Sequence, residues 1–142
     1  MGFFVQWGVF MQNDAKKLTG NTHIATKTIL LVEDDAAIAE LLVQIIVQET
    51  PYRVLSVPDG LQALDMVKNI RPNLLLLDYW LPAIHGIELF DRLRAIKGME
   101  QIPTIMLSVN PPLQEIKKRQ ITCLRKPFDV DQLLHTIQSM MG

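Results

Sequence analysis

Residues 74–82 of the chain read LLLLDYWLP. Four consecutive leucines are too apolar for a strand with one exposed face, and a short apolar run that ends in turn residues is typical of a buried strand in a parallel sheet. Asp78 ends this run and would lie at the carboxyl edge of the sheet, where open α/β folds bind ligands. The stretch alone leaves two interpretations of Asp78 open, a functional carboxylate or a simple strand end or turn cap.

Length and composition indicate one globular domain. The chain has 142 residues, 49% of them hydrophobic, which is enough for one core but too little for two full domains. The net charge of -1 disfavours direct binding to nucleic acid, which needs a basic surface. A single cysteine, Cys123, fits a reducing cytoplasm, and no apolar run reaches the roughly 18 residues of a membrane helix. We therefore expect a soluble cytoplasmic protein that binds neither a membrane nor DNA directly.

Residues 1–27 differ from the rest and are predicted to form an N-terminal extension. Residues 1–11, MGFFVQWGVFM, lack the basic start and the cleavage site of a secretory signal, and residues 12–27 have the polar composition of a linker. Two interpretations stay open: a flexible leader, which is the simpler one, or an arm that packs on an apolar patch of this or a neighbouring molecule. The aromatic residues of such an arm would be Phe3, Phe4, Trp7 and Phe10.

Apolar strands alternate with amphipathic helices from Thr28 onward. The first predicted strand begins at Thr28 and runs into the acids of 33–35, and a helix follows directly, with Asp35 as its cap. The other predicted strands are 52–57, 74–78, 103–108 and 121–125. The other predicted helices are 61–70 with Asp59 as its N-cap, one through residues 87–96 that ends at Gly98, and one from Asp129 or Asp131 to Met140. This order predicts an α/β fold with a parallel sheet covered on both faces.

Polar side chains follow four of the predicted strands. They are Glu33 and Asp34, Asp78, Ser108 and Lys126. Because the carboxyl ends of parallel strands meet at one edge of the sheet, these side chains can converge. Clustered carboxylates without histidine or cysteine suit Mg²⁺ before Zn²⁺, and lysine and hydroxyl groups are natural partners of phosphoryl oxygens. A metal would neutralise the acids enough for Asp78 to act as a nucleophile towards a phosphoryl donor.

Over residues 28–141 the chain resembles the receiver domain of two-component response regulators, a CheY-like domain. The motifs that carry the resemblance are ILLVEDD, DGLQAL, LLLLDYWLPAIHGIEL, IPTIMLS and LRKPFD. The resemblance implies a flavodoxin-like, doubly wound sheet of five parallel strands in the order 2-1-3-4-5, with residues 28–142 as the receiver domain. It also implies a signalling module, not a turnover enzyme. Such a module takes a phosphoryl group from a sensor histidine kinase or phosphotransfer protein and then changes its binding to a downstream protein.

The resemblance assigns a role to each acidic residue at the predicted site. Asp78 would be the phosphoacceptor. Mg²⁺ would be held by Asp34, Asp78 and the backbone carbonyl of Trp80, with Glu33 supporting it through water.

The resemblance also assigns the groups that would contact the phosphoryl oxygens. Ser108 would bond one of these oxygens, and Lys126 would pair with the phosphate. The Lys126-Pro127 peptide bond would be cis, as is usual in the family, and would direct the lysine into the site.

Three features depart from the family pattern. Val109 stands where a small residue is usual, and it would crowd the phosphoryl group. Cys123 replaces an aromatic residue that turns inward on activation. The interval from Ser108 to Lys126 is short by about four residues, roughly one helical turn, and it begins with the proline pair of 110–112. We therefore expect a shortened or irregular fourth helix, intact phosphorylation chemistry and an output face that does not use an aromatic flip.

Alternatives to this interpretation remain. One is a pseudo-receiver that binds a partner without control by phosphorylation. A phosphatase of the haloacid dehalogenase type is disfavoured, because it needs a second aspartate where this chain has Trp80. We expect no DNA-binding or catalytic output domain within the 142 residues. The chain is then a stand-alone regulator or a piece of a longer protein, and both interpretations stay open, as does a homodimer.

Overall fold

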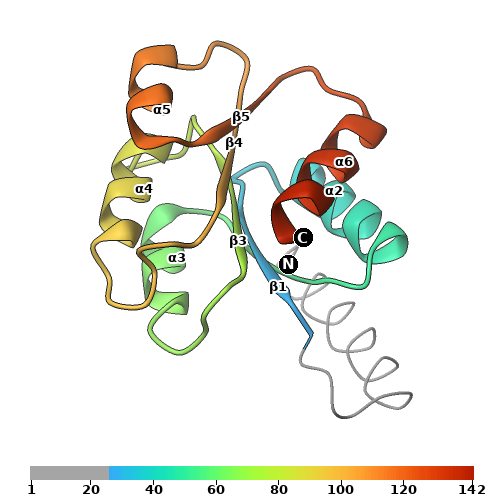
Figure 1. The fold of residues 1–142 in the computed structure, drawn as a ribbon, viewed down its shortest axis with the longest axis horizontal. Coiled ribbons are helices and arrows are strands. Elements are labelled where there is room, and N and C mark those ends of the chain that lie inside the picture. Colours follow the sequence, from blue (N-terminus) through green and yellow to red (C-terminus); the bar gives the residue numbers. More distant parts are fainter. Residues whose placement is uncertain (1–25) are drawn as a thin grey trace.

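The computed structural model of the protein describes residues 26–142, so the predictions for residues 1–25 lie outside the described range. Five parallel strands form one sheet in the order β2-β1-β3-β4-β5 (Figure 1). The strands are β1 Thr28–Val32, β2 Arg53–Val57, β3 Leu74–Asp78, β4 Thr104–Ser108 and β5 Thr122–Arg125. The predicted fold class and strand order are confirmed.

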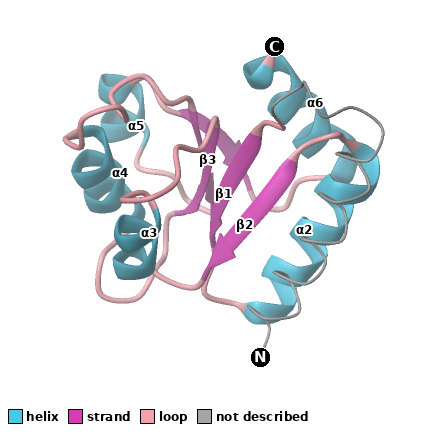
Figure 2. Cartoon of the chain, turned by 90° about the horizontal axis from the view of Figure 1, so that it is seen from below, coloured by secondary structure: helices cyan, strands magenta, loops and turns pink. Residues whose placement is uncertain are grey.

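Five helices in this part of the chain cover both faces of the sheet. They are α2 Ala36–Glu49, α3 Gly60–Met66, α4 Gly86–Arg94, α5 Leu113–Arg119 and α6 Val130–Met141. Helices α2 and α6 lie on one face, and α3, α4 and α5 lie on the other (Figures 1 and 2). No helix in the described range is long and apolar enough to cross a bilayer.

The leucine run of β3 explains why this strand lies in the middle of the sheet. Side chains alternate between the two faces of a strand, so Leu75 and Leu77 enter one core while Leu74 and Leu76 enter the other. All four leucines are buried. A sheet with helices on both faces needs apolar side chains at every position of its central strand, and this is what an unbroken run supplies.

Helix starts agree with the predicted caps, but two helix ends do not. Asp35, Asp59 and Asp129 each accept hydrogen bonds from main-chain N–H groups at the start of α2, α3 and α6. The prediction that α3 extends to residue 70 is wrong: it ends at Met66, because the amides of Lys68 and Asn69 bond three residues back and tighten the chain into turns.

Helix α4 likewise ends before the predicted boundary. It stops at Arg94, and the N–H of Ile96 donates to the carbonyl of Leu93 instead of continuing the helix. Gly98, at a φ of 93°, then turns the chain towards β4. The shortened fourth helix of the prediction is α5, which has seven residues and ends at Arg119, followed by Gln120 as its C-cap with a φ of 57°.

Candidate functional site

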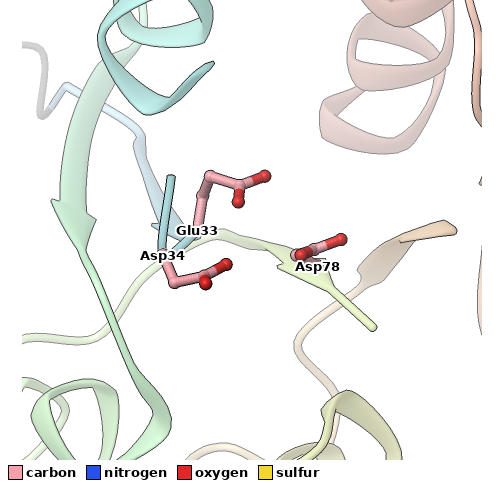
Figure 3. Close-up of side chains that lie close together, drawn as sticks. All are labelled: Glu33, Asp34 and Asp78. Carbon is pink, nitrogen blue, oxygen red and sulfur yellow. The ribbon is translucent and has the colours of Figure 1, made fainter. Parts of the chain in front are cut away.

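Three carboxylates meet where β1 and β3 end. The pairing of Val32 with Leu77 brings the ends of these neighbouring strands level, so Glu33 and Asp34 follow β1 beside Asp78 at the end of β3. Each of the three acids offers an oxygen, and these oxygens all lie within 4.8 Å of one another. Figure 3 shows Glu33 and Asp34 extending from the end of β1 towards Asp78. The fold therefore brings together acids that are 44 positions apart in the sequence.

Glu33 is a buried acid, with 3% of its surface exposed. Its Oε2 atom accepts a hydrogen bond from the N–H of Asp35 at 3.1 Å. Its Oε1 atom is buried without a hydrogen-bond partner among the described residues. Burial raises the pKa of Glu33 to about 7, although the Asp35 amide and Lys126 act in the opposite direction. A buried carboxylate oxygen without a hydrogen-bond partner is well suited to bind a cation or a water molecule that a cation holds.

Asp78 is also buried, and it has a cationic partner. Its Oδ1 atom accepts a hydrogen bond from Nζ of Lys126 at 3.0 Å. Burial raises the pKa of Asp78, while the hydrogen bond and the charge of Lys126 lower it and the charge of Asp34 raises it. Asp34 is exposed, so the acidic cluster is open to solvent on its side.

Lys126 reaches the acids from β5. Its N–H group donates to the carbonyl of Ser108 at 2.9 Å, which extends the pairing of β4 and β5 by one residue. The Lys126-Pro127 peptide bond is cis, as the resemblance implies. Besides its bond to Asp78, the lysine Nζ lies 3.8 Å from Oε1 of Glu33. One ammonium group thus faces both buried carboxylates.

Ser108 ends β4 at the same edge of the sheet. It is 1% exposed, and its hydroxyl group has no hydrogen-bond partner within residues 26–142. Buried hydroxyls normally have a partner, so this one is available to a ligand atom.

Val109 follows Ser108 and is 64% exposed, so the crowding of the phosphoryl group expected of it stays a prediction about the phosphorylated protein. Cys123 lies half-buried on β5 against the core.

Sequence reasoning missed one residue on which the site depends, Gly86 at the start of α4. A Cβ atom here would lie 2.9 Å from the carbonyl oxygen of Asp78 and 2.9 Å from Cα of Tyr79, both main-chain atoms. The N–H group of Gly86 also donates to the carbonyl of Tyr79 at 2.9 Å. Only glycine allows α4 to start this close to Asp78. The sequence feature that could have identified this residue is the glycine in LLLLDYWLPAIHGIEL, which stands eight residues after Asp78.

The acidic cluster fits a hard divalent cation. Its donors are all carboxylate oxygens, and the unpartnered oxygen of Glu33 is the kind of atom that a metal or its bound water satisfies. The carbonyl of Trp80, two residues beyond Asp78, belongs to the loop that leaves this edge of the sheet. The residues present are therefore compatible with Mg²⁺.

Response regulators and their receiver domains are among the known proteins that match this chain. Residues 29–138 match the family model of the response regulator receiver domain. The sporulation initiation phosphotransferase F of Bacillus subtilis is 33% identical over 117 residues, which are 80% of this chain and 92% of that protein. The DNA-binding dual master transcriptional regulator RpaA of Synechocystis is 30% identical over 80% of this chain, but the chain spans only 48% of that regulator.

Solved structures agree with these matches. The chemotaxis response regulator CheY4 of Vibrio cholerae superposes with a TM-score of 0.75 at 27% identity, over 82% of this chain and 99% of that one. The receiver domain of a sensor histidine kinase from Pseudomonas aeruginosa, solved with a magnesium ion coordinated in its active site cleft, gives a TM-score of 0.70 at 30% identity, over 83% and 99%. With its sheet order, its acids and its lysine, the chain belongs to the receiver domains of two-component response regulators.

Proposed function

We propose that this receiver domain accepts a phosphoryl group on Asp78 from a sensor histidine kinase or a phosphotransfer protein, in a reaction that needs Mg²⁺. Phosphorylation then changes the binding of the domain to a downstream protein. The observation that carries this proposal is the meeting of three acids within 4.8 Å of one another with the Lys126 ammonium 3.0 Å from Asp78.

Asp78 is the nucleophile in this proposal. An oxygen of its carboxylate attacks the phosphorus of a phosphohistidine, and an acyl phosphate forms as the bond between phosphorus and the histidine nitrogen breaks. The nitrogen leaves with the bonding electrons and takes up a proton. The hydrogen bond from Lys126 favours the charged carboxylate that this attack requires, against the effect of burial.

Lys126 and Ser108 act on the phosphoryl oxygens. Once Asp78 carries the phosphoryl group, the Lys126 ammonium is placed to pair with a phosphoryl oxygen, and the free Ser108 hydroxyl can donate to another.

Asp34, Asp78 and the Trp80 carbonyl would hold Mg²⁺, with Glu33 acting through water. The ion would neutralise the carboxylates and the negative charge of the phosphoryl group.

The relatives suggest the class of partner but not its identity. One is a phosphotransferase of sporulation and another a DNA-binding regulator about twice as long as the matched segment. For this chain, a protein partner is the simpler proposal, because a net charge of -1 offers no basic surface for DNA. We further propose that residues 28–142 form the receiver and that residues 1–27 are an extension to it.

Labelling with acetyl phosphate tests the proposal. The protein should acquire one phosphoryl group in the presence of Mg²⁺, and Asp78→Asn or removal of the metal with EDTA should abolish the label. Asp65→Asn is the matched control, because Asp65 is an exposed aspartate on α3, paired with Lys68 and away from the acidic cluster. Label that persists in Asp78→Asn would contradict the assignment of the acceptor. No label from acetyl phosphate or from a panel of kinases would favour the pseudo-receiver.

A further inference from the structure

Three aromatic rings gather in the loop that joins β3 to α4, immediately after Asp78. The ring of Trp80 meets the rings of Tyr79 and His85 edge-on, with centroids 5.1 Å and 5.4 Å apart. The rings of Tyr79 and His85 are stacked, 6.2 Å apart at an interplanar angle of 20°. These distances lie within the range of attractive ring contacts. Trp80, which is 60% exposed, and His85 lie on the surface, whereas Tyr79 is partly buried and packs against the core.

The main chain on either side of Trp80 is fixed. The N–H of Tyr79 donates to the carbonyl of Leu107 on β4 at 2.9 Å, and the carbonyl of Tyr79 accepts from the N–H groups of Leu81 and Gly86. Leu81 is 3% exposed and anchors the other side of Trp80 in the core. Trp80 therefore stands between two anchored residues, while its own side chain is 60% exposed and is held by the neighbouring rings.

His85 occupies the N-cap position of α4, yet within the described range its side chain makes no capping hydrogen bond. Serine, threonine, aspartate and asparagine are the residues that stabilise a helix at this position. The His85 side chain therefore acts in this loop through its ring, which contacts the rings of Tyr79 and Trp80 near the start of the loop.

We propose that His85 is a positioning residue for the metal site. Its ring holds the Trp80 side chain in place and so fixes the Trp80 backbone carbonyl beside the acidic cluster. This inference rests on the proposed function, in which that carbonyl is a ligand of Mg²⁺. The ring contacts of His85 in the described structure are with Tyr79 and Trp80 and not with the acids, so its effect is exerted through Trp80.

Two substitutions separate the ring of His85 from its place at the helix start. His85→Ser removes the ring but supplies a good N-cap, so α4 should lose no stability. His85→Phe keeps a ring of similar shape. In a Trp7→Phe background Trp80 is the sole tryptophan, and its fluorescence reports on this loop. Mg²⁺ is titrated into each variant, and its binding is monitored by Trp80 fluorescence and by the amide NMR shifts of residues 33–35 and 79–81. The urea unfolding of each variant is measured in parallel.

His85→Ser should raise the dissociation constant for Mg²⁺ by about threefold or more, with about tenfold as the limit set by the free energy of the ring contacts, and leave the urea midpoint unchanged. His85→Phe should restore the affinity to within about twofold. Equal affinity in the serine variant, or a loss that phenylalanine does not restore, would overturn the role of the ring. If neither signal responds to Mg²⁺ while His85 is intact, the metal site itself fails, and the positioning role fails with it.

Discussion

Glu33 shows how burial sets the behaviour of a single residue in this site. Its pKa of about 7 arises mainly from desolvation, and its Oε1 atom has no hydrogen-bond partner in the described part of the chain. The folded protein therefore holds a proton on Glu33 at pH values where the unfolded chain, with a pKa near 4.5, has lost it. Without metal, the stability contributed by this group falls as the pH rises from about 4.5 to about 7.

Glu33→Gln tests this effect. Glutamine resembles the protonated acid, so without metal the substitution should raise the free energy of unfolding by about 1–3 kcal/mol at pH 8 and leave it nearly unchanged at pH 5. Urea titrations at both pH values in EDTA measure the difference. An equal change at the two pH values would show that the charge of Glu33 is not the cause.

Gly86 gives a second prediction for a single residue. Gly86→Ala places a methyl group 2.9 Å from main-chain atoms of Asp78 and Tyr79, which cannot give way as a flexible side chain can. We expect a loss of about 1–3 kcal/mol in the free energy of unfolding, together with weaker labelling of Asp78 by acetyl phosphate. Gly60→Ala is the control, because a Cβ there meets only side-chain atoms, at 3.2 Å or more. Similar losses in the two variants would contradict the explanation.

Among the elements, α5 depends most on its neighbours. It has only seven residues and buries Ile116, and its N-cap residue, Pro112, provides no side-chain cap in the described structure. So short a helix is not stable by itself. Arg119 holds the helix against α4: it donates two hydrogen bonds to Asp91 of α4, at 2.7 Å and 2.8 Å, and it also donates to the carboxylate and the main-chain carbonyl of Glu115, at 2.7 Å and 3.1 Å. These bonds lower the pKa of Asp91.

Arg119→Met should therefore loosen α5 more than it destabilises the whole protein. We expect faster hydrogen exchange at the amides of α5, with a global loss of only about 0.5–1 kcal/mol because the pair is partly exposed. Exchange followed by mass spectrometry measures both. Arg92→Met is the matched control, since Arg92 pairs with Glu88 inside α4 and should leave α5 unchanged. Unchanged exchange in α5 of the Arg119 variant would mean that packing alone holds the helix.

The elements also show what the sequence can and cannot predict. The leucine run of β3 specifies a central buried strand, and the caps at Asp35 and Asp59 specify helix starts, because these signals are local. The end of α3 at Met66 depends on turn bonds that periodicity does not contain. The ring cluster around Trp80 depends on the path of a loop that includes Ala83 at a φ of 66°, and spacing does not predict this path.

At the scale of the whole molecule, two cores on opposite faces of one sheet hold the strand ends in place. The acids come from β1 and β3 and the lysine from β5, so the site depends on the register of the entire sheet. A rigid sheet that carries polar groups at one edge is the usual way in which α/β folds build a site.

Binding of Mg²⁺ should therefore stabilise the whole domain. A ligand that binds only the folded state raises the melting temperature, and deprotonated acids bind a cation more tightly. We expect Mg²⁺ to raise the melting temperature more at pH 8 than at pH 6, because the pKa of Glu33 is about 7. Asp34→Asn should remove most of this increase. A Mg²⁺ effect of equal size in that variant would place the ion elsewhere.

The most direct test of the account is to locate the phosphoryl group. The protein is treated with acetyl phosphate and Mg²⁺, and borohydride then reduces the acyl phosphate, which converts the modified aspartate to homoserine. Peptide mass spectrometry should find homoserine at position 78 in the protein without substitutions, and at no position when Asp78 is replaced. Homoserine at Asp34 or at another aspartate, or none at all while the protein still binds Mg²⁺, would contradict the account.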